Sequence, residues 1–146
     1  MKKIETQSDH SPCVCLRLRK ASRAVSRFYD AQLQPANIRG TQYAMLRHIA
    51  AVSDITVGDL SELLSMDQST ATRGIDVLYK NGLIAFAASP DDARKKILVL
   101  TQAGTDKMRE AEPLWNAAQK KIQSTLKGSD LASLFHLLDT VAEVAR

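Results

Sequence analysis

Cysteine is scarce in this 146-residue chain, aromatic residues make up only 5%, and no long apolar run occurs. The two cysteines, Cys13 and Cys15, stand one residue apart, which excludes a disulfide framework and agrees with a reducing compartment. No apolar stretch approaches the roughly 18 residues that a membrane span requires, and no apolar signal core follows the first residues. These absences predict a cytoplasmic protein that does not contact a membrane.

Patterns that indicate catalysis or metal binding are also missing. The three histidines, His10, His48 and His136, lie far apart, so a zinc site is not expected. The chain has neither a glycine-rich phosphate loop nor a nucleophile–base constellation. A chain of this length forms one domain. We therefore expect a single domain over residues 1–146 that binds no metal or other cofactor and is not an enzyme.

The net charge of +4 decides little, but the basic residues are clustered. One cluster consists of Arg17, Arg19, Lys20, Arg23 and Arg27, and a second consists of Arg94, Lys95 and Lys96. Clustered cations suit nucleic acid, because each phosphate that they neutralise releases condensed counterions. On charge alone, two solvated faces explain the clusters equally well.

The spacing of apolar residues predicts a mainly α-helical fold with one small β-hairpin. Helices are expected over about residues 13–34, 41–52, 102–126 and 131–145, after a loose segment over residues 1–11. Pro35 should end the first of them, and Pro113 should kink or interrupt the long one. The hairpin is expected from strands over residues 83–87 and 97–100.

Two short helices separated by a three-residue turn occupy the middle of the chain. Thr56 is suited to cap the first helix, and Asp59 favours its start electrostatically. Asp67 can cap the second helix, and Gly82 can adopt the left-handed conformation that ends it. This arrangement is typical of a helix-turn-helix, which places its second helix in the major groove of DNA.

The second of these helices carries small or hydrogen-bonding side chains on its outer face. Arg bonds bidentately to guanine, Gln bonds to adenine, and Ser or Thr bonds to base edges or phosphates. The start of the helix should also present free backbone N–H groups to a phosphate. The predicted DNA contacts on this helix are Gln68, Ser69, Thr70, Thr72 and Arg73.

The hairpin is predicted to form a second DNA contact, a wing with a polar, basic tip. Arg94 should enter a minor groove, where negative potential attracts guanidinium, while Lys95 and Lys96 contact phosphates. Asp92 should hold either Arg94 or the turn. The alternative is a surface ion pair that contributes about 0–1 kcal/mol.

Five segments together resemble the MarR family of bacterial regulators. They are TVGDLSEL (56–63), QSTATRG (68–74), NGLI (81–84), SPDDAR (89–94) and LVLTQAG (98–104). The resemblance extends over about residues 13–143. It implies a winged helix-turn-helix lobe over residues 41–101, with dimerisation helices over residues 13–34 and 102–146. It also implies an obligate homodimer, usually a repressor, with Arg73 and Arg94 as the chief DNA contacts. The resemblance also leaves room for a small aromatic effector between the lobe and the dimerisation helices, whereas Trp115 is expected to pack at the long helix.

A homodimer is also expected from the apolar surfaces of the terminal helices, which a domain this small cannot cover internally. Two-fold symmetry would place the two recognition helices about 34–36 Å apart, so the double-stranded DNA operator should be an inverted repeat.

The two cysteines suggest a thiol-based sensor as an alternative. By resemblance to the organic-hydroperoxide-sensing (OhrR-like) branch of the family, Cys15 stands at the reactive position and Tyr29 at that of a thiolate-orienting tyrosine. Oxidation by a hydroperoxide would then release DNA. Arg19 and Gly40 stand where that branch tends to have further tyrosines, so inert thiols remain an alternative. Cys13 would pair with Cys15 only under strain within one chain, whereas pairing between subunits is open.

Two other function classes compete with a transcriptional regulator. A thiol–disulfide oxidoreductase built on Cys13 and Cys15 would need alternating strands and helices, but only one hairpin is predicted. A non-specific architectural DNA-binding protein would bind random and inverted-repeat duplexes equally. The sequence favours a sequence-specific regulator, a homodimeric repressor that a small effector or an oxidant releases from DNA.

Overall fold

The computed structural model describes residues 12–144, and the expected loose segment 1–11, with His10, and Ala145 lie outside them. Its elements are α1 (Val14–Leu33), the 3₁₀ helix η1 (Gln34–Ala36), α2 (Gly40–Ala51), α3 (Val57–Leu63), α4 (Gln68–Lys80), β1 (Ile84–Ala88), β2 (Lys96–Leu100), α5 (Gln102–Thr125) and α6 (Asp130–Glu143). The prediction of a mainly α-helical fold with one hairpin is confirmed. No helix in the described part of the chain is long and apolar enough to cross a membrane.

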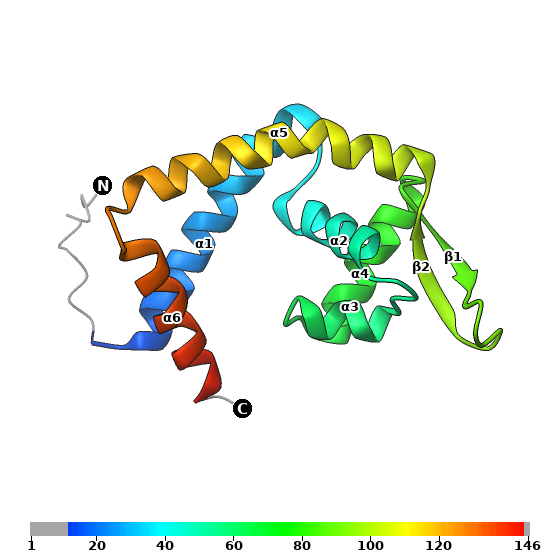
Figure 1. The fold of residues 1–146 in the computed structure, drawn as a ribbon, viewed down its shortest axis with the longest axis horizontal. Helices are drawn as coiled ribbons and strands as arrows, with labels where there is room; N and C mark the ends of the chain where they lie inside the picture. The colour runs from blue at the N-terminus through cyan, green and yellow to red at the C-terminus, as the bar shows by residue number, and fades with distance from the viewer. Residues whose placement is uncertain (1–11, 145–146) are drawn as a thin grey trace, which may run out of the picture.

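Helix α5 connects two parts of the molecule (Figure 1). One part, which we call the hairpin lobe, consists of α2, α3, α4 and the β1–β2 hairpin, and it lies beside the N-terminal half of α5. The other part, which we call the helical arm, consists of α1 and α6 together with the C-terminal half of α5. The core lies in the hairpin lobe, where Leu46, Leu60 and Leu78 are fully buried, whereas no residue of α6 is buried.

Short-range interactions set the helix boundaries in the middle of the chain. Thr56 and Asp59 form a reciprocal capping box at the start of α3, with side-chain bonds to each other's backbone N–H of 3.1 and 2.8 Å. Asp67 caps α4, and Gly82 follows that helix with a φ of 70°. The predicted caps and the predicted helix-turn-helix are therefore present.

Of the two prolines that were expected to affect helices, Pro35 follows the end of its helix as predicted, whereas Pro113 does not end its helix. Helix α1 ends at Leu33, and Pro35 lies in the short 3₁₀ helix that follows it. Pro113 lies within α5, which continues through it to Thr125, so the expected break does not occur. Pro113 is exposed, and the carbonyl that loses its helical partner therefore lies on the solvent side.

Strand β1 lies one residue later than predicted, and β2 begins one residue earlier than predicted and ends at the predicted residue. Strand β1 ends at Ala88, which pairs with Lys96 at the start of β2. Lys96 therefore belongs to the ladder and not to the loop at the tip. Strand β2 also contacts the chain before α3, because the Leu98 N–H donates to the Ile55 carbonyl at 2.8 Å.

The start of α5 joins the start of the hairpin at very short range. The Thr101 Oγ1 caps α5 by accepting the Gly104 N–H at 3.0 Å, and it donates to the Gly82 carbonyl at 2.6 Å. Gly104 is buried, and a Cβ built on it would lie 1.9 Å from the Leu83 carbonyl oxygen. No side chain fits there without moving α5 away from the hairpin.

Gly104→Ala should therefore lower the free energy of unfolding by about 3 kcal/mol, the upper part of the range for overpacking. The measurement is chemical denaturation at a fixed protein concentration. Gly58→Ala is the matched control, because its Cβ would meet only the Thr56 Oγ1 at 3.7 Å. That change should leave stability within about 0.5–1 kcal/mol of the original. Equal effects of the two changes would contradict the close approach.

Candidate nucleic-acid interface

Helix α4 presents a polar face to solvent and an apolar face to the core. Ala71, Ile75 and Leu78 are buried against the rest of the hairpin lobe. All five residues predicted to contact DNA on this helix are exposed on it, namely Gln68, Ser69, Thr70, Thr72 and Arg73. The helical period separates the two sets, so the exposed set is free for an external partner.

The N-terminus of α4 is not as free as the sequence suggested. The Asp67 carboxylate accepts the Thr70 N–H at 2.8 Å and the Thr70 Oγ1 at 2.6 Å. One of the N–H groups at the start of this helix, that of Thr70, is therefore already used by a carboxylate of the chain itself. The hydrogen bonds from Thr70, side chain first and backbone second, lower the pKa of Asp67, with a smaller contribution from the Arg73 charge.

The wing is held by backbone hydrogen bonds around Asp92. Its carboxylate accepts the Arg94 N–H at 3.0 Å, and its carbonyl accepts the Lys95 N–H at 3.0 Å. Asp92 was expected to hold either the Arg94 side chain or the turn, and these bonds show that it holds the turn. The side chains of Arg94, Lys95 and Lys96 are exposed around it.

Sequence reasoning missed the residue that anchors the base of the wing. Ser89 is buried, and its Oγ donates to the Asp54 carboxylate at 2.8 Å although the two residues lie 35 positions apart. The same Oγ accepts the Asp91 N–H at 3.3 Å. Asp54 adopts a left-handed φ of 55° in the turn before α3. This contact connects the wing to the helix-turn-helix, and no local pattern reveals it.

One cation of the wing also lies close to α3. The pKa of Asp59 is lowered mainly by its hydrogen bonds with Thr56, and the charge of Lys95 lowers it further. The charge of Lys95 in the wing therefore acts on the first turn of α3.

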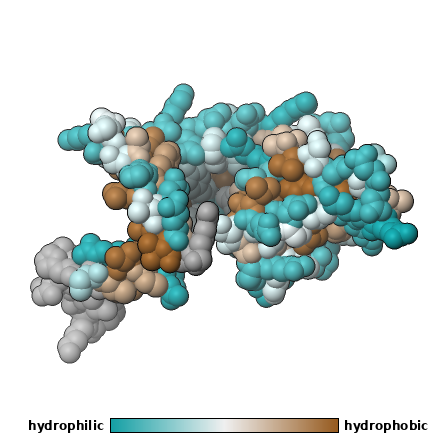
Figure 2. Space-filling model, turned by 60° about the horizontal axis from the view of Figure 1, so that its bottom comes forward, coloured by the Kyte–Doolittle hydropathy of each residue, from teal (hydrophilic) through white to brown (hydrophobic). Residues whose placement is uncertain are grey.

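The helical arm carries a broad apolar surface (Figure 2). The apolar residues exposed on α1 and α6 are Val14, Leu16, Leu18, Val25, Leu134, Phe135, Leu137, Leu138, Val141 and Val144. Phe135 and Leu137 retain 56% and 59% of their accessible surface, which is unusual for side chains of this size.

Comparison with known proteins shows a similarity to one family. The model of the MarR family matches residues 38–96, which cover α2 and nearly the whole helix-turn-helix and wing. Over this region the chain is similar to the MarR family. The prediction of a DNA-binding transcriptional regulator with a winged-helix fold is thereby confirmed.

Several members are similar over most of their length. The chain is 27% identical over 116 residues to the multiple antibiotic resistance protein MarR of Escherichia coli, covering 79% of this chain and 81% of that protein. It is 29% identical over 104 residues to an organic hydroperoxide resistance transcriptional regulator of Bacillus subtilis, covering 69% and 71%. The crystal structure of the M. tuberculosis regulator MosR in complex with DNA superposes with a TM-score of 0.78 at 28% identity, covering 92% and 98%. These proteins are transcriptional regulators, so the thiol–disulfide oxidoreductase is not favoured.

Two hollows of this protein lie where the helical arm meets the hairpin lobe. One of about 220 Å³ is lined by Val25, Ser26, Tyr29, Asp30, Gly40, Thr41 and Trp115. Burial raises the pKa of Tyr29 at its edge. On the other side of Trp115, the Arg47 guanidinium stacks 4.5 Å from the indole, beside a hollow of about 320 Å³. Trp115 thus packs between the two.

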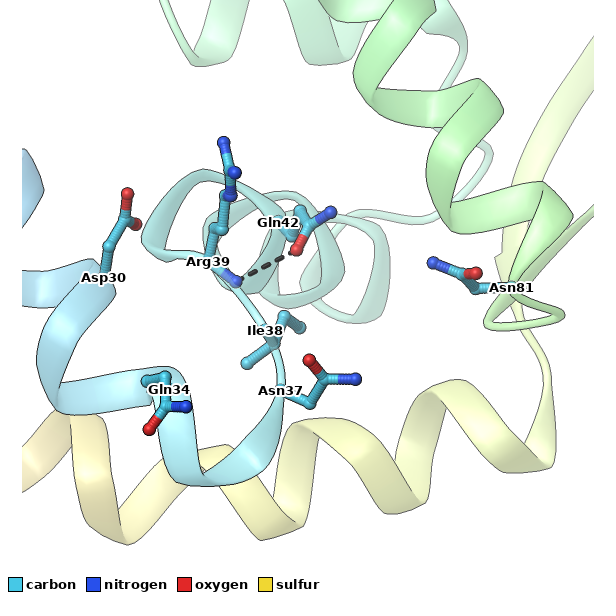
Figure 3. A pocket seen from close by; sticks show the side chains of 7 residues that line it. All are labelled: Asp30, Gln34, Asn37, Ile38, Arg39, Gln42 and Asn81. Atoms are coloured by element: carbon cyan, nitrogen blue, oxygen red, sulfur yellow. Dashed lines mark hydrogen bonds between the residues drawn. The ribbon is translucent and has the colours of Figure 1, made fainter.

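A third, more polar pocket of about 550 Å³ lies nearby (Figure 3). Asn81, at the end of α4, faces it from one side, and Asn37 and Arg39 face it from the segment before α2. The Arg39 N–H donates to the Gln42 side chain at 2.9 Å, and the Gly40 N–H donates to the Asp30 carboxylate at 2.8 Å. The second bond connects the end of α1 to the start of α2, and the first caps α2. Sequence reasoning did not indicate this pocket.

The two cysteines are both exposed near the start of α1. Cys13, and not Cys15, is the N-cap, and its Sγ accepts the Leu16 N–H at 3.5 Å. Tyr29 lies 14 residues after Cys15 on the same helix, a separation of about 21 Å along the axis. The structure therefore does not bring Cys15 and Tyr29 together within one chain. No group of three or more potential ligands for a metal occurs among residues 12–144.

Ser89→Ala should loosen the wing, because it removes the bond to Asp54 and leaves a half-buried carboxylate without that donor. We expect a loss of about 1 kcal/mol in stability and faster amide hydrogen exchange over residues 89–95. Ser53→Ala is the matched control, since Ser53 is exposed in the neighbouring turn. Unchanged exchange in the loop of Ser89→Ala would show that the wing does not depend on this contact.

Proposed function

We propose that this protein is a homodimeric repressor that recognises an inverted-repeat operator in double-stranded DNA and leaves it when an effector binds. The observation that carries the proposal is the combination of an exposed polar α4 and an exposed basic wing on one lobe, joined through Ser89 and Asp54. The genome is its target, so we also propose that it works in the cytoplasm.

The proposed DNA contacts divide into two groups. Base contacts come from α4 through Gln68, Ser69, Thr70, Thr72 and Arg73, and from Arg94 in a minor groove. Lys95 and Lys96 contact phosphates, while Asp92 supports the wing. Arginine and glutamine provide the bidentate hydrogen bonds that distinguish base pairs, whereas lysine contributes charge to any sequence. The DNA complex of MosR supports the corresponding arrangement here.

The proposed dimer forms through the terminal helices, residues 13–34 and 102–146, while residues 41–101 contact DNA. The large exposed side chains of α1 and α6 support this division, because they would cost free energy if they stayed in water. A two-fold axis through the helical arm would present two copies of α4 to successive turns of one face of the duplex.

We propose a small aromatic molecule as the effector, bound in the hollow beside Trp115. Tyr29 and Trp115 offer ring surfaces there, and the hollow lies where the helical arm meets the hairpin lobe. A ligand at this position could change the angle between the two parts and so the spacing of the recognition helices.

A hydroperoxide is the second candidate effector. The similarity to an organic hydroperoxide resistance regulator and the exposure of Cys15 support it. Cys15 and Tyr29 would then have to meet across the dimer, because they are far apart within one chain.

The central experiment selects a duplex from a random pool with the purified protein and measures its affinity. An inverted repeat should emerge, and sedimentation should show a dimer bound to it. Arg94→Ala should weaken binding by about fivefold to a hundredfold, the cost of one base contact, without changing dimerisation or helix content. Arg109→Ala is the charge-matched control on exposed α5. Unchanged affinity of Arg94→Ala would remove the wing from the interface.

The oxidant hypothesis has a separate test. Cumene hydroperoxide should release the selected duplex from the original protein and from Cys13→Ser, but not from Cys15→Ser, because only Cys15 would then form the sulfenic acid. The measurement is fluorescence anisotropy of a labelled duplex. Failure of the oxidant to release the original protein would eliminate this hypothesis and favour the aromatic ligand.

A further inference from the structure

A negative charge lies on the face of α4 that is proposed to approach DNA. The Asp67 carboxylate is exposed at the first turn of the helix, beside the side chains proposed to contact bases. Phosphates repel a carboxylate, and capping does not require one, because Asn, Ser and Thr cap helices about as well. Helix α3 demonstrates this in the same chain, since its cap is the neutral Thr56.

Asp67 is connected to Arg73 through Thr70. The Thr70 hydroxyl donates its hydrogen to the Asp67 Oδ1 at 2.6 Å, so its lone pairs point away from the carboxylate. One of them accepts a hydrogen bond of 3.3 Å from the Arg73 Nη2. The three side chains therefore form a row along the first turn and a half of α4, with the guanidinium at its end.

This row restricts where the Arg73 charge can go. Without a partner, a long arginine side chain samples many rotamers and pairs with any phosphate in reach. The bond to Thr70, polarised by the carboxylate behind it, biases the guanidinium towards one position over the helix. The lowered pKa of Asp67 keeps that carboxylate ionised well below neutral pH.

We propose that Asp67 is a specificity-determining positioning residue, which holds Arg73 through Thr70 so that it pairs with a base of the operator and not with phosphates of unrelated DNA. This inference rests on the proposed function, because it requires Arg73 to contact DNA. On the operator, Arg73 keeps its bond to Thr70 and gains the base. On random DNA, the guanidinium has to leave Thr70 before it reaches a phosphate, and Asp67 opposes that movement.

The test compares Asp67→Asn with the original protein on the selected duplex and on a scrambled duplex of equal composition. Asparagine retains a side-chain oxygen for the Thr70 N–H but carries no charge. The scrambled duplex should bind more tightly, and the ratio of the two affinities should fall by about fivefold or more, as for one weakened base contact. Asp76→Asn is the matched control, because it removes the same charge from an exposed position on the same helix.

The dependence on salt provides a second readout. If Arg73 moves to a phosphate in Asp67→Asn, the slope of log affinity against log salt should steepen by about one on the scrambled duplex. The slope on the selected duplex should not change. Asp76→Asn should raise both affinities by the same factor, because it alters charge without releasing Arg73.

A second pair of variants keeps the test valid if Asp67→Asn unfolds, which circular dichroism would detect. Thr70→Val removes the hydroxyl from the row and should lower the affinity ratio, whereas Thr70→Ser retains the hydroxyl and should preserve more of the ratio. If Asp67→Asn changes the affinities for both duplexes by the same factor, as Asp76→Asn should, the proposed role of Asp67 is overturned and the proposed function is not affected. A lack of preference in the original protein would instead overturn the proposed function.

Discussion

The close approach of α5 to the hairpin at Gly104 is the constraint on which the rest of the structure depends. The Leu83 carbonyl occupies the space that a side chain at residue 104 would need. Thr101 adds bonds to both Gly82 and Gly104, so the end of α4, the hairpin and α5 meet within a few residues. Because α5 continues from there into the helical arm, this junction sets the direction in which the arm leaves the hairpin lobe (Figure 1).

That direction matters because the two ends of α5 have different tasks in the proposed function. Its N-terminal end packs beside the hairpin and α2, and its C-terminal end packs beside α1. A helix is stiff over this length, so a small rotation at the junction becomes a large displacement of the recognition helix relative to a dimer axis in the arm. The hollows around Trp115 lie between the junction and the arm, where a ligand would act on that rotation.

Two aspartates near the proposed DNA surface, Asp59 and Asp67, occupy different positions at the starts of their helices. In α3 the threonine is the cap and Asp59 bonds back to it, whereas in α4 the aspartate is the cap and Thr70 bonds back. Only the second arrangement continues to an arginine. The charge of Asp67 thus acts on the side chain proposed to contact a base, while the charge of Asp59 acts on Lys95 of the wing.

The sequence by itself determined the order of the helices, the caps of α3 and α4, the glycine after α4 and the polar face of the recognition helix. Each of these depends on residues within three or four positions of one another, and the periods of helix and strand make such interactions visible in a single chain. The family resemblance rested on the same local segments, and the model of the MarR family matches the region that contains most of them.

Only the tertiary structure decided which distant residues meet. The bond between Ser89 and Asp54 spans 35 positions, and Arg47 lies over Trp115 although the two belong to different helices. Cys15 and Tyr29, which the resemblance paired, lie far apart on one rigid helix. Such contacts depend on how the helices pack, and packing is settled by the shape of the whole core and not by any local pattern.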